Sequence, residues 1–138
     1  MNRQDLQILS KIRIRESKSL LDAGHYAGSY YLAGYALECA IKSAIAKRTR
    51  RYDFPNKKLA NESYSHNLQA LLKVAGLWVR LDTEMSANTA LNDNWSVAKD
   101  WDESARYDLK ITDVDARDLY SACAAKNNGL LTWLRANW

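Results

Sequence analysis

The stretch that decides the fold is HYAGSYYLAGYALECAIKSAIAKR, residues 25–48. It contains no proline and is rich in alanine, and its apolar residues recur near the 3.6-residue period of an α-helix, with apolar neighbours between them. A helix that is apolar nearly all round is buried on more than one side. We therefore expect this stretch to be the central helix of a bundle, with Leu37, Ile41 and Ile45 in the core and small residues admitting neighbouring helices.

Periodicity and helix breakers predict four further helices. The chain has one proline and five glycines, which favours long helices over many short strands. Gly24 and Gly76 are expected to end helices, while Ser65 and Thr112 are expected to begin them as N-caps. We expect helices over residues 3–23, 25–48, 65–75, 77–98 and 112–138, with loops over 49–64 and 99–111. The predicted fold class is all-α, an up-and-down bundle of about five helices in one domain, residues 1–138.

The first predicted helix has two distinct faces. Its apolar residues fall roughly on one stripe, which we expect to face the core: Leu6, Leu9, Ile12 and Leu20, with Glu16 among them. The other face is basic and carries Lys11, Arg13, Arg15 and Lys18.

Composition excludes several classes of protein. No apolar run approaches the roughly 20 residues of a membrane span, and the first ten residues lack the apolar core of a signal peptide. We expect a cytoplasmic protein with no membrane contact, in which Cys39 and Cys123 are small core residues. Two histidines and no Cys or His cluster predict no metal site. No glycine-rich phosphate loop is present, and no cofactor is expected.

The net charge of +4 is unevenly distributed. The first 58 residues carry 12 Lys or Arg and 5 Asp or Glu, whereas the remaining 80 carry 8 and 11. Much of the excess gathers after the central helix, where aromatic residues are interleaved, and such a composition suits phosphate and base contacts. The nucleic-acid-binding candidates are Lys47, Arg48, Arg50 and Arg51. The alternative is a solvated set of cations favoured by the helix C-terminus.

Glu38 and Lys42 stand one helical turn apart in an otherwise apolar stretch. A pair at this spacing supports the helix, and the apolar setting makes it a candidate site. One interpretation is a ligand site in which Lys42 contacts phosphate and Glu38 orients it. The other is a buried ion pair that fixes helix register.

Four stretches carry a resemblance to a known family: LLDAGHYAGSYYLAGYALECAIKSAIAKR (20–48), SHNLQALLKVAGL (65–77), ARYD (105–108) and the last predicted helix (112–138). Together they resemble the HEPN domain family. They match, in order, the family's helix pair with its Glu–Lys pair, its short helix opening on a Ser/Thr-His-x-Leu type motif, its Arg-Tyr pair and its final helix. The resemblance covers most of the chain. It implies an α-helical bundle, frequent homodimers and an association with RNA processing.

Many members of that family are metal-independent ribonuclease toxins paired with a small nucleotidyltransferase-type partner. Their nucleases use an arginine followed, after four to six residues, by a histidine. This chain lacks that motif: His25 lies 10 residues after Arg15, and His66 lies 15 residues after Arg51. Because histidine is the usual general acid or base at neutral pH, no catalytic residue is expected.

The resemblance adds three candidate ligand-binding residues to Glu38 and Lys42. His66 either faces a groove as a ligand contact or hydrogen-bonds into the preceding loop. Arg106, beside Tyr107, either holds phosphate or pairs with a nearby carboxylate. Tyrosines at helical spacing, by contrast, are interpreted as packing residues: Tyr26, Tyr30, Tyr31 and Tyr35.

Three functions remain open at this point. The first is a degenerate, non-catalytic HEPN domain that binds a nucleotide, RNA or a protein partner in a toxin–antitoxin-like or nucleotidyltransferase-associated system. The second is a ribonuclease toxin in which Lys42, His66, Arg106 and Tyr107 meet at a groove. The third is a purely structural interaction module. A homodimer is expected, with the contact through the last helix and residues 95–107.

Overall fold

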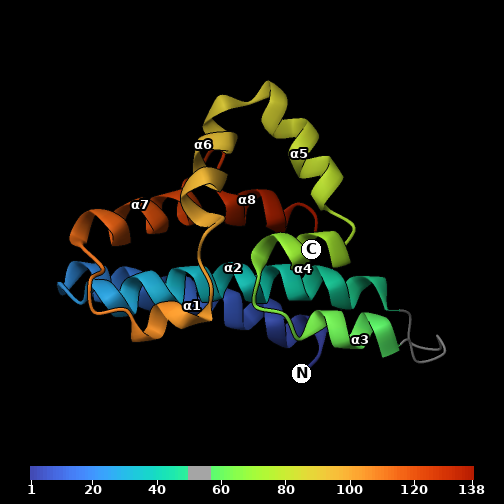
Figure 1. Cartoon of the computed structure of the whole chain (residues 1–138), viewed down its shortest axis with the longest axis horizontal. Helices are drawn as coiled ribbons and strands as arrows, with labels where there is room; N and C mark the ends of the chain where they lie inside the picture. The colour runs from blue at the N-terminus through green and yellow to red at the C-terminus, as the bar shows by residue number, and fades with distance from the viewer. Residues whose placement is uncertain (50–56) are drawn as a thin grey trace.

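The computed structural model describes residues 1–49 and 57–138 (Figure 1). Within these residues the chain forms eight α-helices and one 3-10 helix, and no strand. The predicted all-α fold is confirmed. The count of about five helices is wrong, because two expected long helices are interrupted and both expected loops contain a helix. In the described part of the chain no helix is long and apolar enough to cross a membrane.

Helices α1 (Arg3–Asp22) and α2 (Tyr26–Arg48) form an antiparallel hairpin (Figure 1). Asn2 and Asp5 cap the start of α1 reciprocally, each side chain accepting a hydrogen bond from the other residue's backbone N–H. The turn between the helices passes through Gly24, whose φ of +82° suits glycine and strains other residues. The predicted ends of both helices are confirmed to within one or two residues.

The buried face of α1 differs from the predicted stripe. The buried residues are Ser10, Ile14, Ser17 and Leu21, whereas the expected stripe is only half-buried. Ser10 donates a hydrogen bond to the Ala36 carbonyl at 2.8 Å, and Ser17 donates to the Ser29 carbonyl at 2.8 Å. Small hydroxyl side chains let the two helix backbones approach closely and find their partners on the facing helix. Apolar periodicity alone does not reveal this face.

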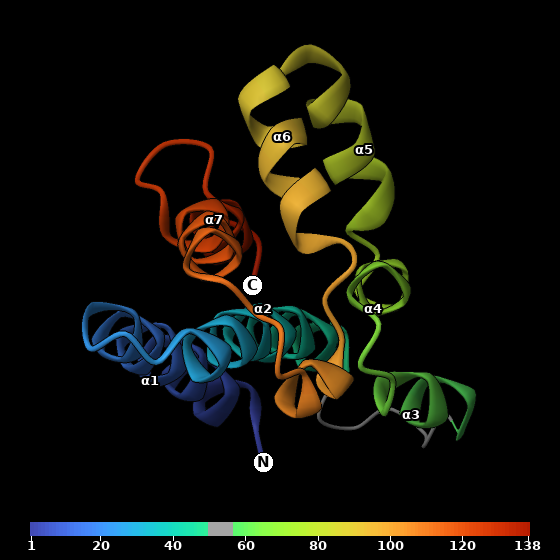
Figure 2. The same ribbon diagram turned by 60° about the vertical axis from the view of Figure 1, so that its left-hand side comes forward.

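Helix α2 is the central helix, as predicted. Leu37, Ile41 and Ile45 are 1%, 1% and 5% exposed. Besides α1, it contacts α4, α7, α8 and the 3-10 helix η1. Figure 2 shows α1 and α7 on one side of α2, and α4 and η1 on the other.

Two expected long helices are each broken near an asparagine. Residues 77–98 form α5 (Trp78–Ala87) and α6 (Thr89–Ala98), a hairpin that projects from the rest of the molecule (Figure 1). The break falls at Asn88, which leaves the helical conformation and caps α6 by accepting a hydrogen bond from the Leu91 N–H. Residues 112–138 form α7 (Asp113–Ala124) and α8 (Leu130–Arg135), and between them Asn128 has a φ of +61°.

The shorter elements also correct the sequence-based boundaries. Helix α3 (Lys57–Ser63) lies inside the expected loop 49–64. Helix α4 (Leu68–Val74) begins later than expected, because Asn67, rather than Ser65, caps it by accepting a hydrogen bond from the Ala70 N–H at 2.8 Å. The helix η1 (Glu103–Tyr107) lies in the second expected loop. The predicted caps at Thr112 and Gly76 are confirmed.

Trp101 packs directly on α2 and sets the position of the segment that leads into η1. Its side chain is 2% exposed. A Cβ atom added at Gly34 would lie 2.1 Å from the Trp101 ring, so only glycine leaves room for this contact. The ring of Tyr31 stacks on Trp101 with 6.0 Å between centroids, and Tyr35 stacks on Tyr31 at 6.1 Å. The interpretation of these tyrosines as packing residues agrees with this arrangement.

Candidate functional site

The candidate site is built around a buried carboxylate on α2. Glu38 is a charged residue, yet it is only 2% exposed and lies among the core residues Leu37 and Ile41. Its Oε1 atom lies 2.8 Å from Lys42 Nζ and 2.8 Å from His66 Nδ1. An ionised carboxylate in an apolar interior is costly unless it is paired, and these two contacts supply the pairing.

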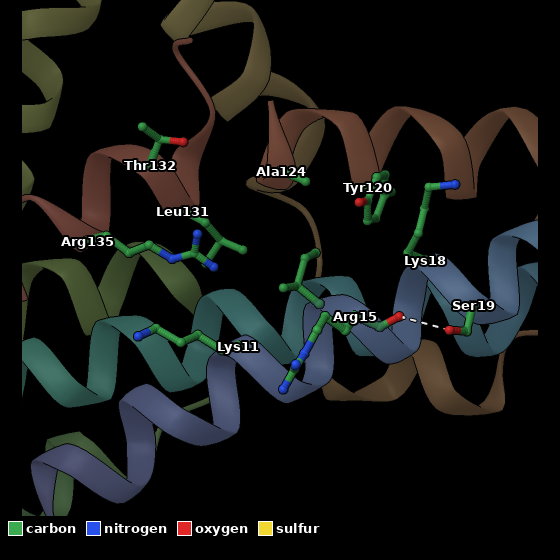
Figure 3. Close-up of a pocket in the computed structure, with 10 residues that line it drawn as sticks. Lys11, Arg15, Lys18, Ser19, Tyr120, Ala124, Leu131, Thr132 and Arg135 are labelled. Atoms are coloured by element: carbon green, nitrogen blue, oxygen red, sulfur yellow. Dashed lines mark hydrogen bonds between the residues drawn. The ribbon is translucent and has the colours of Figure 1, made fainter. Parts of the chain in front are cut away.

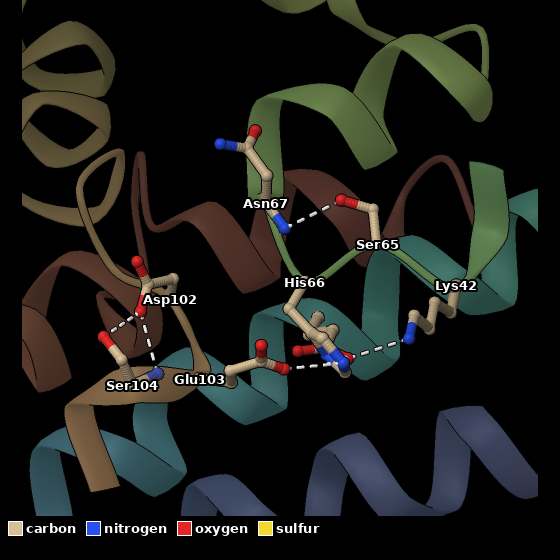
Figure 4. Close-up of polar contacts among 8 residues, drawn as sticks. Lys42, Ser65, His66, Asn67, Asp102, Glu103 and Ser104 are labelled. Carbon is tan, nitrogen blue, oxygen red and sulfur yellow. Dashed lines mark hydrogen bonds and ion pairs between the residues drawn. The ribbon is translucent and has the colours of Figure 1, made fainter. Parts of the chain in front are cut away.

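His66 links α2 to η1. It lies immediately before Asn67, the cap of α4, and its ring reaches back to α2. The other ring nitrogen, Nε2, lies 2.6 Å from Glu103 Oε2 (Figure 4). The imidazole therefore stands between two carboxylates from different elements. A ring can donate a hydrogen bond to both of them only as the doubly protonated imidazolium.

Local hydrogen bonds fix Glu103 in place. The Asp102 side chain begins η1 by accepting hydrogen bonds from the Ser104 N–H at 2.8 Å and from the Ser104 hydroxyl (Figure 4). These two bonds, the side-chain bond first, lower the pKa of Asp102. The turn presents Glu103 towards His66, so the expected loop 99–111 supplies one member of the site.

The four side chains Lys42, Glu38, His66 and Glu103, hereafter the polar cluster, nearly balance each other's charges. Two potential cations face two carboxylates, and Glu38 Oε1 already has two partners. The cluster therefore has no surplus of positive charge with which to bind phosphate. Glu38 Oε2 is different, because it is buried and, within the described residues, has no hydrogen-bond partner.

Arg106 and Tyr107, the other two predicted ligand-binding residues, do not join the polar cluster. Tyr107 is 73% exposed, and the Arg106 guanidinium lies over its ring, 4.9 Å from the centroid. None of the ion pairs found among residues 1–49 and 57–138 includes Arg106. Of the two alternatives for Arg106, the pairing with a nearby carboxylate is therefore not formed.

The predicted nucleic-acid-binding cations fall into separate places. Arg50 and Arg51 lie outside the described residues. Lys47 is exposed near the end of α2. Arg48 donates a hydrogen bond to the Val74 carbonyl at 2.7 Å, at the C-terminal end of α4. A cation there satisfies a terminal carbonyl and interacts favourably with the helix dipole, so Arg48 has a structural partner.

Thiol and metal chemistry find little support in the site. Burial, and then the Glu38 carboxylate, raise the pKa of the Cys39 thiol to about 11. Burial also raises the pKa of Cys123, which agrees with the prediction that both cysteines are core residues. Across the described residues, no group of three or more His, Cys, Asp or Glu side chains could hold a metal ion.

Sequence reasoning found three members of the polar cluster and missed the fourth. Glu38, Lys42 and His66 are brought together, whereas Glu103 is separated from His66 by a long stretch of chain and belongs to no local pattern. Its only sequence signal is its position in the acidic segment close to Arg106. A pocket lined by cations of α1 and α8 was also missed. Three residues of the predicted basic face line it, Lys11, Arg15 and Lys18, whereas Arg13 does not.

We expect Lys42→Met to destabilise the protein by about 2–4 kcal/mol, because it leaves the buried Glu38 carboxylate with one partner fewer. Glu38→Gln, which removes the charge but keeps the shape, should cost less. In the Glu38→Gln background, Lys42→Met should lower the free energy of unfolding only slightly further. Urea denaturation of the two single variants and the double variant measures this coupling. Equal cost of Lys42→Met in both backgrounds would show that the two side chains are not energetically coupled.

The chain was compared with known proteins at three levels: no family model matches it, and neither does any curated protein or solved structure. Its function is therefore inferred from the side-chain geometry and from the four stretches that resemble the HEPN family.

Proposed function

We propose that this protein is a non-catalytic, degenerate HEPN-like module that binds a nucleotide, an RNA or a protein partner. We further propose that it acts in a toxin–antitoxin-like or nucleotidyltransferase-associated system. The observation that carries the non-catalytic assignment is the engagement of His66 at both ring nitrogens, at 2.8 Å and 2.6 Å from carboxylate oxygens. A general base must offer a free ring nitrogen to the substrate, and this ring offers none while η1 is in place.

The ribonuclease alternative has weaker support. It requires Arg106 and Tyr107 to meet Lys42 and His66, yet Arg106 stacks on Tyr107, and both side chains are exposed. Lys42 is already bonded to Glu38 at 2.8 Å. The four residues therefore do not present a common set of donors to a scissile phosphate.

The purely structural interaction module is supported by an exposed apolar patch between η1 and the start of α7. The side chains of Tyr107, Leu109 and Val114 are 73%, 98% and 57% exposed. Contiguous apolar side chains on a surface are typical of protein contacts. Tyr107 belongs to the 95–107 segment and Val114 to the last predicted helix, which are the two parts of the expected homodimer contact. The chain has five tryptophans and eight tyrosines, which would favour a dimer if they were exposed, but Trp95 and Trp101 are buried within the monomer.

The function is tested by incubating the purified chain with total RNA and by titrating it with labelled RNA at low and high salt. We expect salt-dependent binding without cleavage, since phosphate contacts release counterions and His66 is engaged at both ring nitrogens. The His66→Gln variant should behave like the wild type. If the wild type degrades RNA and folded His66→Gln does not, the protein is a ribonuclease and the non-catalytic assignment is wrong. If neither RNA nor nucleotides bind at low salt, the interaction module becomes the better explanation.

For the homodimer, light scattering at tens of micromolar protein should give twice the monomer mass. The Leu109→Glu and Val114→Glu double variant should be monomeric, because it places charge in the proposed contact. A matched control is Val79→Glu, since Val79 is 76% exposed on α5, away from this patch. A wild type of monomer mass, or a dimer that survives the double variant, would contradict the proposed contact.

A further inference from the structure

A groove lies between α1 and the pair α7 and α8, and it has a volume of about 700 Å³ (Figure 3). We call it the α1–α8 groove. Its charged rim consists of Lys11, Arg15, Lys18 and Arg135. None of the residues proposed above as ligand contacts lines it, so it is separate from the polar cluster.

The fold accounts for the position of the cations. Ser10 and Ser17 pack α1 against α2, and the flank of α1 beside them carries the cations. Lys11, Arg15 and Lys18 recur at intervals of four and three residues, which places them on one stripe of the helix. The break between α7 and α8 lets Arg135 of α8 face this stripe across the groove (Figure 3).

The positive charge of the groove is largely uncompensated. Lys18 pairs with Asp22 at 2.6 Å. Within the described part of the chain no ion pair includes Lys11, Arg15 or Arg135. Lys11 and Arg135 instead lie 5.7 Å and 6.0 Å from the centroid of the Trp138 ring. Several cations around one concave site attract an anion, because each adds to the same local potential.

The groove also has an apolar floor. Ile14 and Leu131 line it and are 8% and 1% exposed, and the half-buried Tyr120 adds an aromatic ring. A site that combines an apolar floor with a few charged groups, within about 300–1,000 Å³, is typical of small-molecule binding. The three cations on α1 extend over about 10 Å of helix, by the rise of about 1.5 Å per residue. That length suits a row of phosphates better than a single one.

We propose that the α1–α8 groove binds a nucleoside di- or triphosphate. Its phosphates contact Lys11, Arg15 and Arg135, and its base and sugar lie on the floor formed by Ile14, Leu131 and Tyr120. Arginine suits this role, since its planar guanidinium can donate two hydrogen bonds to one phosphate. The inference rests on the proposed binding function and gives it a site and a ligand class.

The test is a titration of the full chain with a fluorescent nucleoside triphosphate, with Arg15→Gln and Arg135→Gln combined in one variant. The control is Arg13→Gln with Lys73→Gln, which removes the same charge outside the groove, since Lys73 is exposed on α4. Arg13 is a good match because it lies on α1 and pairs with Glu16 at 2.8 Å. Circular dichroism checks that both variants keep their helices.

We expect the groove variant to bind at least about tenfold more weakly, because each lost contact is a charged hydrogen bond, and the control to bind within about twofold of the wild type. Inorganic triphosphate should compete with the nucleotide for the groove. Tyr120→Leu should weaken the binding of the nucleotide more than the binding of the triphosphate. Equal losses in the groove variant and the control would overturn the groove assignment and leave the binding function standing.

Single-stranded RNA provides the second arm of the experiment. A ten-nucleotide RNA should bind more weakly than the nucleotide, since the groove is the size of a small molecule. If the RNA binds more tightly than the nucleotide and a separate Lys47→Gln variant loses that binding, the assignment of a nucleoside di- or triphosphate is wrong. If RNA, nucleotide and triphosphate all fail to bind the wild type at low salt, the groove inference and the nucleic-acid form of the proposed function fail together.

Discussion

The close approach of neighbouring segments to helix α2 is the constraint on which the rest of the structure depends. Ala33, Ala36 and Ala40 are 0% exposed, and Gly34 is also buried. On one side, serine hydroxyls of α1 reach the α2 backbone carbonyls. On the other side, the Trp101 ring occupies the space that a side chain at position 34 would fill. Small residues on α2 therefore determine where α1 and η1 lie.

The positions of the polar cluster and of the α1–α8 groove both follow from this packing on α2. The segment held by Trp101 leads into η1 and brings Glu103 to His66, which in turn contacts the buried Glu38 (Figure 4). Figure 2 shows α1 beside α2 and below α7, and Lys11, Arg15 and Lys18 of α1 line the groove. The two regions have different electrostatics, since the polar cluster is close to neutral and the groove is cationic. We therefore propose a structural role for the polar cluster and a ligand-binding role for the α1–α8 groove.

The sequence was sufficient for features that depend on local pattern. It predicted the all-α class, the central helix, the buried Leu37, and the pairing of Glu38 with Lys42, which requires only helical spacing. It missed the break at Asn88, because a single asparagine is tolerated within a helix and only tertiary packing decides that it caps. At the second break the sequence did hold a local turn signal, Asn-Asn-Gly over residues 127–129, which the expected helix 112–138 ignored. It also missed the contact of His66 with Glu103 and the approach of Arg135 to α1. Those contacts join segments far apart in the chain and leave no periodic signal.

The central claim is that α2 must carry small residues where other segments pack across it. The free energy of unfolding of the Gly34→Ala variant tests this claim most directly. Gly28→Ala on the same helix is the control, because its added Cβ would meet only the Leu20 Cδ1 atom, at 3.1 Å, and a flexible side chain can move. Alanine gains about 1 kcal/mol of helix propensity over glycine at either position. Overpacking against Trp101 should cost about 1–3 kcal/mol or more, so Gly34→Ala should unfold at lower urea than Gly28→Ala. If Gly34→Ala is as stable as Gly28→Ala, the requirement for a small residue where Trp101 crosses α2 is contradicted.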